Sequence, residues 1–261
     1  MALMFGGINF YTDLIGPKLD FDQQHSPHFR FALLSVPRCG SNLLGSMLIA
    51  TQQAGCPLEY LNREFLNAYL KTKGLKQIDL GYYLNDLESR RTSANGRFGV
   101  KVHWHQFADI YNGGKGGIKR EGVAYLRGMD RVIRLYRRDK VAQAVSLYVA
   151  SVTNRWVEVA DGKVDESPYK ELPFDPIAIS NYLQQIITEE RNWLSFLQLN
   201  KIKYDSMSYE ELAEEYQEAS IKILSWLGVS DIKEPPQPMI KKQENPHKQR
   251  LRDEYLAYVG A

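Results

Sequence analysis

Short apolar segments followed by polar loops and helical patterns recur along this chain. Residues 29–35, Phe-Arg-Phe-Ala-Leu-Leu-Ser, form a mostly apolar run with the length of a buried strand. A polar loop over residues 36–42 follows, and residues 43–50 have the length and composition of a helix. The hydrophobic pattern therefore predicts a strand–loop–helix unit at the start of the core.

The same unit is repeated in part further along. Residues 98–104 and 131–136 each read as a strand, and Asp139 is placed to cap a helix over residues 140–150. Strands that alternate with helices imply a parallel sheet covered by helices, so the chain is predicted to have an α/β fold.

A long amphipathic helix is predicted in the second half of the chain. Its apolar positions recur at steps of three, four and seven residues, as expected of one buried helical face. These positions are Ile179, Tyr182, Ile186, Trp193 and Leu197. Their expected role is core packing.

The C-terminal third has weaker patterns. Residues 202–204 are predicted to form a further strand, and residues 209–227 a further helix that ends at Gly228. Beyond the prolines at 235–238, the tail is basic and is predicted to be loop-like until Leu251.

Glycines and prolines interrupt residues 1–28, so this part is predicted to be an N-terminal extension. Residues 29–261 are predicted to form a single domain, because the chain of 261 residues is long enough for one large core. We find no internal repeat.

Composition excludes several classes of protein. The apolar fraction is 44% and the formal net charge is +2, so neither extensive disorder nor a broad basic surface for nucleic acid is expected. No run of apolar residues approaches the length of about 20 residues that a membrane span needs. The two cysteines, Cys39 and Cys56, cannot form a disulfide framework, and the N-terminus lacks a basic start, so a cytoplasmic location is predicted.

The loop after the first strand has the features of an anion site. A glycine-rich loop before a helix presents unpaired N–H groups at the positive end of the helix dipole. Gly40 permits close approach of a phosphate, Ser41 and Asn42 add side-chain donors, and Arg38 supplies a planar charged group. The lysine of the ATPase loop is absent, which disfavours ordinary Mg-ATP chemistry.

A second anion site is predicted after the strand at 131–136. Arg138 ends this segment, and Ser146 follows eight residues later. Eight helical residues rise ~12 Å, so an arginine laid along the helix brings the two side chains to a single phosphate. A solvated first helical turn is the alternative interpretation.

Together these motifs carry a resemblance. Residues 37–44, Pro-Arg-Cys-Gly-Ser-Asn-Leu-Leu, resemble the 5′-phosphosulfate loop of sulfotransferases, and Arg138 with Ser146 resembles their 3′-phosphate motif. With residues 55–60, 99–101 and 154–156, the chain resembles the bacterial trehalose 2-sulfotransferase-like family over about residues 29–250. Cys39 and Asn42 depart from the serine and threonine that are usual in this family.

The resemblance implies a P-loop-like three-layer α/β sandwich and the donor 3′-phosphoadenosine 5′-phosphosulfate (PAPS), without a metal. It also suggests a carbohydrate hydroxyl as acceptor and a homodimer. The donor would be held by two groups of residues, the second of which is assigned more weakly. These are Arg38, Cys39, Gly40, Ser41, Asn42, Arg138 and Ser146, and then Tyr209, Lys242 and Gln243.

Transfer to an alcohol needs a base, and two candidates remain open. The resemblance assigns Glu59 as the catalytic carboxylate, whereas His103 ends its strand where parallel sheets open their crevice. Glu59 is the favoured one. Lys101 could support the transferring group together with Arg38. The candidates for acceptor contacts are Trp104, His105 and Trp156, and residues 158–176 are a candidate lid.

Two other functions stay open. The chain could bind PAPS or its product without catalysis, or it could be a kinase with a degenerate phosphate loop. Turnover of ATP would identify the kinase, and tight nucleotide binding without sulfate transfer would identify the binding protein.

Overall fold

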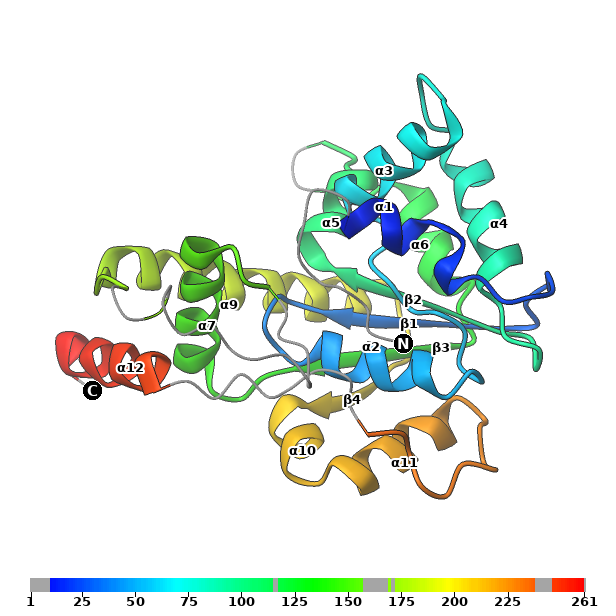
Figure 1. Cartoon of the computed structure of the whole chain (residues 1–261). Coiled ribbons are helices and arrows are strands. Elements are labelled where there is room, and N and C mark those ends of the chain that lie inside the picture. Colours follow the sequence, from blue (N-terminus) through cyan, green and yellow to red (C-terminus); the bar gives the residue numbers. More distant parts are fainter. Residues whose placement is uncertain (1–9, 115–116, 157–168, 170–171, 238–245, 261) are drawn as a thin grey trace.

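The computed structural model describes residues 10–114, 117–156, 169, 172–237 and 246–260. Its centre is a four-stranded sheet of β1 (Phe29–Ser35), β2 (Arg97–His103), β3 (Arg131–Tyr136) and β4 (Asp205–Ser208). The strand order is β2-β1-β3-β4, and all neighbouring strands are parallel (Figure 1). This confirms the predicted α/β fold with a central parallel sheet.

Helices cover both faces of the sheet, because successive residues of a strand point to opposite sides. Phe31 and Leu33 of β1 belong to one core, which contains α2 (Ser41–Ala50), α10 (Tyr209–Glu214) and α11 (Tyr216–Trp226). Ala32 and Leu34 belong to a larger core on the other face. The architecture is therefore the predicted three-layer arrangement.

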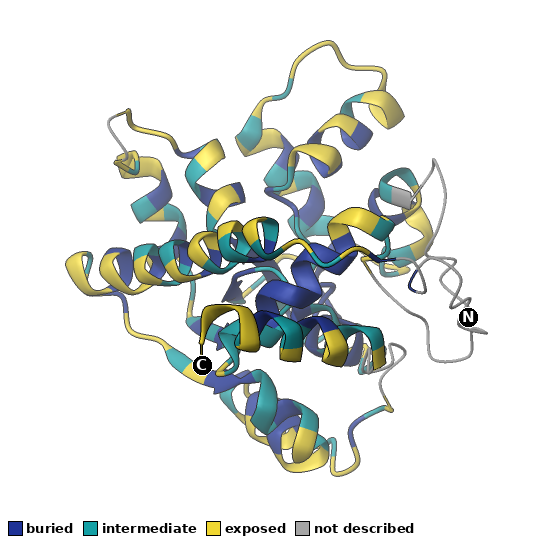
Figure 2. Cartoon of the chain, turned by 90° about the vertical axis from the view of Figure 1, so that its left-hand side faces the viewer, coloured by how far each residue is buried: buried dark blue, intermediate teal, exposed yellow. Residues whose placement is uncertain are grey.

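The larger core includes eight helices of the described residues. They are α1 (Phe10–Ile15), α3 (Arg63–Lys73), α4 (Leu80–Arg91), α5 (Trp104–Ile110), α6 (Arg120–Arg127), α7 (Lys140–Thr153), α9 (Pro176–Leu199) and α12 (Pro246–Val259). Figure 2 shows the buried residues on the sheet and on the inward faces of the surrounding helices.

The strongest sequence patterns predicted their elements well. The strands at 29–35 and 131–136 have the predicted bounds. Asp139 caps α7, accepting a hydrogen bond from the Ala142 N–H at 2.8 Å. Ile179, Ile186, Trp193 and Leu197 all lie on the buried face of α9.

Three predictions for the C-terminal third were wrong in detail. The last strand is Asp205–Ser208 rather than 202–204, since only its four residues pair with β3. The helix predicted over 209–227 is divided at Glu215, whose φ of −118° and ψ of 49° are not helical. The tail becomes helical at Pro246, before Leu251.

Residues 10–20 pack onto the domain. Leu14 and Ile15 of α1 are 6% and 2% exposed, and they belong to the larger core. Arg91 of α4 is fully buried and donates to the carbonyl oxygens of Leu14 and Gly16 at 3.0 and 2.7 Å. The boundary at residue 28 stays a prediction, but Leu14 and Ile15 of the predicted extension belong to the core.

Within the described ranges, no helix combines the length and apolar character needed to cross a membrane.

Candidate active site

The carboxyl ends of the parallel strands bring the predicted site together. In the strand register, Ser35 at the end of β1 pairs with His103 at the end of β2. Arg38, Arg138 and Tyr209 follow the ends of β1, β3 and β4. Since these strands run in one direction, residues distant in sequence meet at one edge of the sheet, where α/β folds bind ligands.

The loop between β1 and α2 has the backbone of an anion site. Arg38 and Gly40 adopt left-handed φ values of 68° and 82°, and α2 begins at Ser41. A Cβ at Gly40 would lie 2.6 Å from Cδ2 of Tyr209, so only glycine fits between the loop and α10. The first N–H groups of α2 have no carbonyl partner within their own helix, as an anion site requires.

The side chain of Arg38 joins this loop to α7. Arg38 Nε donates to Ser146 Oγ at 3.0 Å, and one of its terminal nitrogens donates to the Trp156 carbonyl oxygen at 2.6 Å. Gln143 is fully buried and donates to the Pro37 carbonyl oxygen at 2.7 Å. The loop and the middle of α7 are thus held together by side chains.

Arg138 and Ser146, which were predicted to bind one phosphate together, have different partners in the structure. Arg138 Nε is 3.6 Å from Glu210 Oε2, and the backbone N–H of Arg138 donates to the same carboxylate. The bonds of the described residues join Ser146 to Arg38 and Arg138 to Glu210. Nearby, the Arg137 guanidinium lies 4.7 Å from the centre of the Tyr209 ring. The proposed pairing of Arg138 with Ser146 on one phosphate thus stays a prediction.

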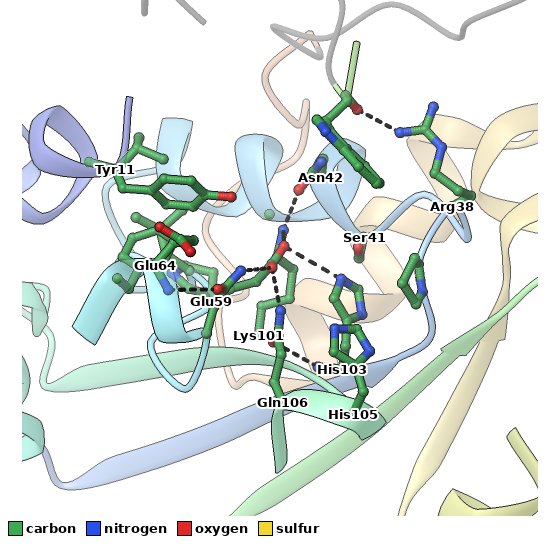
Figure 3. Close-up of a pocket in the computed structure, with 18 of the residues that line it drawn as sticks. Tyr11, Arg38, Ser41, Asn42, Glu59, Glu64, Lys101, His103, His105 and Gln106 are labelled. Atoms are coloured by element: carbon green, nitrogen blue, oxygen red, sulfur yellow. Dashed lines mark hydrogen bonds and ion pairs between the residues drawn. The ribbon is translucent and has the colours of Figure 1, made fainter. Parts of the chain in front are cut away.

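Glu59, in the loop between α2 and α3, lies at the centre of the candidate site. Oε1 of Glu59 is 2.9 Å from Lys101 Nζ and 3.5 Å from His103 Nε2, and Oε2 accepts a hydrogen bond from Gln106 at 2.7 Å (Figure 3). Burial alone would raise the pKa of Glu59, but the positive charge of Lys101 and the hydrogen bond with His103 hold it well below its usual range. Glu59 is therefore a carboxylate at neutral pH.

Lys101 and His103 are fixed by contacts with neighbouring strands and loops. Lys101 is 3% exposed, and its Nζ also donates to Asn42 Oδ1 of the phosphate loop. His103 Nδ1 shares a hydrogen bond of 2.9 Å with Ser35 Oγ. Lys101 thus directly connects Glu59 with Asn42, at the start of α2.

A second carboxylate–histidine pair lies beside the first. His105 Nδ1 is 3.3 Å from Oε2 of Glu189, a buried residue of α9, and the rings of His103 and His105 stack with centroids 5.8 Å apart. Burial alone would lower the pKa of His105, but its hydrogen bond with Glu189 raises it. Burial would raise the pKa of Glu189, but His105 lowers it. The site therefore has two carboxylates, each in contact with a histidine.

These groups open into a cavity of about 430 Å³. Of the predicted site residues, the cavity is lined by Arg38, Ser41, Asn42, Glu59, Lys101, His103, His105 and Trp156. Figure 3 shows Arg38 and Tyr11 on opposite sides of Glu59 and Lys101. One cavity is thus lined by residues of the loop after β1, by both candidate bases and by two of the proposed acceptor contacts.

Some predicted residues lie elsewhere. Trp104 packs against Trp193 in the core, with ring centroids 5.0 Å apart, and does not line the cavity, so we do not retain it as an acceptor contact. Cys39 is fully buried, and burial raises the pKa of its thiol, so its side chain fills the loop interior. Lys242, Gln243 and most of the candidate lid at 158–176 lie outside the described residues.

Sequence reasoning missed three residues of the site. Glu189 lies three residues after Ile186 and four before Trp193, so its place on the apolar stripe of α9 was a usable signal. Gln106, which bonds Glu59, and Tyr11, which lines the cavity, had no such signal. No cluster of three metal-ligating side chains occurs among the residues that the structure describes.

Comparison with known proteins defines the class. The profile of the Stf0 sulphotransferase family matches residues 30–257, and a trehalose 2-sulfotransferase from Mycobacterium tuberculosis is 25% identical over 262 aligned residues, covering 87% of this chain and 94% of that protein. The protein is thus a sulfotransferase enzyme. More narrowly, the chain belongs to the Stf0 sulphotransferase family, which confirms the resemblance to trehalose 2-sulfotransferases.

Solved structures were also compared with the chain. A sulfotransferase from Alicyclobacillus acidocaldarius aligns with a TM-score of 0.48 and 13% identity, covering 90% of this chain and 92% of that one. The sulfotransferase domain from the curacin biosynthetic pathway aligns with a TM-score of 0.42 and 15% identity, covering 87% and 97%.

Proposed function

We propose that this enzyme transfers a sulfuryl group from PAPS to a hydroxyl of a small acceptor, with Glu59 as the base. The observation that carries the proposal is the contact of Lys101 with both Glu59 and Asn42. Through it, the proposed base and the proposed phosphate loop lie within one side chain of each other, as transfer between donor and acceptor requires.

The donor side is supported by the loop after β1. Sulfuryl transfer needs an activated donor, and the 5′-phosphate of PAPS fits the first N–H groups of α2 and the guanidinium of Arg38. Ser146 and Arg138 remain candidates for the 3′-phosphate, and Tyr209 lies against Gly40 in the same region. These residues would bind and orient the nucleotide.

Glu59 and Lys101 have separate roles in the proposed transfer. The acceptor oxygen attacks the sulfur while the bond from sulfur to the bridging phosphate oxygen breaks, and Glu59 takes the hydroxyl proton. Lys101 can stabilise the charge that grows on that bridging oxygen, because its ammonium already faces the loop. The products are a sulfate ester and 3′,5′-ADP. His103 is the alternative base, at 3.5 Å from Glu59.

A carbohydrate acceptor is proposed from the name of the mycobacterial relative and from the cavity. His105 and Trp156 line it, where they offer a donor and an apolar ring for a sugar. Homodimer formation and the cytoplasmic location remain predictions.

Thermal stabilisation by nucleotides tests the donor. We expect saturating 3′,5′-ADP to raise the melting temperature clearly more than ATP with Mg²⁺ does. Equal stabilisation by the two would contradict the proposal and would favour the kinase. Labelled PAPS with a panel of sugars, read by mass, then tests transfer. Tight binding of 3′,5′-ADP with no transfer to any hydroxyl would instead support the non-catalytic nucleotide-binding protein.

A further inference from the structure

The N-terminal segment of residues 10–19 lines the active-site cavity, although the family profile begins at residue 30. Tyr11, Leu14 and Leu19 of this segment line the cavity together with residues of the phosphate loop and Glu59. We propose that this segment is the apolar wall of the acceptor site, and that the natural acceptor is an alcohol carrying an apolar group. This inference rests on the proposed function and deepens it.

Two arginines of α4 hold the N-terminal segment in place. Arg91, buried in α4, donates to the carbonyl oxygens of Leu14 and Gly16 at 3.0 and 2.7 Å, and its Nε lies 2.7 Å from Asp20 Oδ1. Arg90 pairs with the same carboxylate at 2.7 Å. These contacts fix both ends of residues 14–20, so the apolar side chains form part of a preformed site.

Leu14, Leu19 and Phe65 line the cavity near Tyr11, together with the polar Asn62 and Glu64. The ionic groups gather around Glu59 and Lys101, next to the phosphate loop. Tyr11 lies on the other side of Glu59 from Arg38 (Figure 3), where its ring packs edge-on against Phe65 at a centroid distance of 5.3 Å. The leucine, isoleucine and phenylalanine residues that line the cavity are Leu14, Leu19, Ile49, Leu58, Phe65 and Leu147, of which Leu58 and Leu147 adjoin Glu59 and Ser146 in the chain.

The apolar lining near Tyr11 favours an acceptor that carries an apolar group. A hydroxyl that reaches Glu59 belongs to the polar end, but sugar hydroxyls placed against leucine and phenylalanine would lose their hydrogen bonds to water without replacement. An alkyl or aromatic group placed there would instead gain from burial. Asn62 and Glu64 interact with the Tyr11 hydroxyl, so the apolar contact falls to the hydrocarbon side chains of Leu14, Leu19 and Phe65.

Two sugars with identical hydroxyls test the inference. Binding of methyl and hexyl β-D-glucopyranoside to the full chain is measured by calorimetry in the presence of 3′,5′-ADP. We expect the hexyl compound to bind at least about tenfold more tightly, since burial of two of its five additional methylene groups suffices for that ratio. Leu19→Ser and Tyr11→Ser should each reduce the preference several-fold. Tyr82→Ser, at a tyrosine that is 61% exposed in α4, is the control and should keep the preference.

The outcomes separate the inference from the proposed function. Equal binding of the two glucosides, no binding of the hexyl compound, or the same preference in the Leu19→Ser and Tyr11→Ser variants would overturn the apolar wall. Binding of 3′,5′-ADP to each variant shows that it is folded. Failure of every hydroxyl compound to accept sulfate from PAPS would overturn the proposed function, whereas the preference in binding would still stand.

Discussion

Arg38 and Ser146, which are separated by 108 residues in the chain, are joined by a hydrogen bond of 3.0 Å between Nε and Oγ. The sequence assigned Arg38 to the 5′-phosphate and Ser146 to the 3′-phosphate. The contact brings together one residue proposed for each phosphate.

Arg38→Lys should therefore weaken nucleotide binding. A lysine keeps the charge but loses the planar donor pair that contacts Ser146 and Trp156. We expect the Kd for 3′,5′-ADP to rise about tenfold or more, measured by calorimetry. Arg63→Lys, at an exposed arginine paired with Asp109, is the control. An unchanged Kd in Arg38→Lys would exclude Arg38 from the nucleotide site.

Glu59→Gln should remove the proposed base while preserving the shape of the side chain. We expect kcat to fall by a factor of order 10² or more, with the Kd for 3′,5′-ADP nearly unchanged. His103→Asn should have the smaller effect, because His103 contributes by orienting Glu59 from 3.5 Å. A larger loss of turnover in His103→Asn would make the histidine the base.

The pH profile provides an independent test of the same assignment. The base must be deprotonated, and the pKa of Glu59 is held well below its usual range. The acid limb of kcat/KM should therefore lie below pH about 4.3, the ordinary glutamate value. A limb between about pH 6 and 7, where imidazoles titrate, would contradict Glu59 as the base.

Gly40→Ala should damage the phosphate loop more than a comparable change elsewhere. The φ of 82° strains any other residue, and the new Cβ would lie 2.6 Å from the Tyr209 ring. We expect a loss of about 2–4 kcal/mol in the free energy of unfolding, from strain and overpacking together. Gly74→Ala is the matched control, with a φ of 66° and no atom within 4 Å of the Cβ, and should lose only about 1–2 kcal/mol. Equal losses in urea unfolding would show that Tyr209 does not restrict the loop.

Glu189→Gln should destabilise the protein in a defined pH range. The pKa of His105 is raised in the folded state, so its contribution is complete below about pH 6.5 and is lost as the pH rises through the folded value. The pKa of Glu189 is lowered, so its contribution is present above about pH 4.3 and is lost as the pH falls through the folded value. The pair therefore stabilises most between these pH values.

Urea unfolding at pH 5.5 and pH 8 measures this dependence. We expect Glu189→Gln to lose about 1–2 kcal/mol at pH 5.5, a figure reduced for the 47% exposure of the His105 side chain, and less at pH 8. Gln185→Ala removes the neighbouring 2.8 Å hydrogen bond to Glu189 without removing a charge, and should have an effect that changes little with pH. A cost of Glu189→Gln that is independent of pH would contradict the ionic pair.

Sequence patterns predicted best where one local rule was sufficient. The apolar run at 29–35 has the length expected of a buried strand, and the capping side chain of Asp139 marked the start of α7. The local hydrophobic pattern did not give the strand bounds at 202–208, because these depend on which residues pair with β3. Similarly, no local signal indicated that the glycine-interrupted N-terminus supplies Leu14 to the core.

The sequence by itself determined the parallel sheet, the glycine loop before α2 and the identity of the charged residues, since these depend on local periodicity and spacing. Only the tertiary structure decided that Ser146 faces Arg38, that Lys101 contacts both Glu59 and Asn42, and that Tyr11 lines the cavity. The reason is that parallel strands bring their carboxyl ends to one edge, so contacts there depend on strand order and helix packing rather than on distance along the chain.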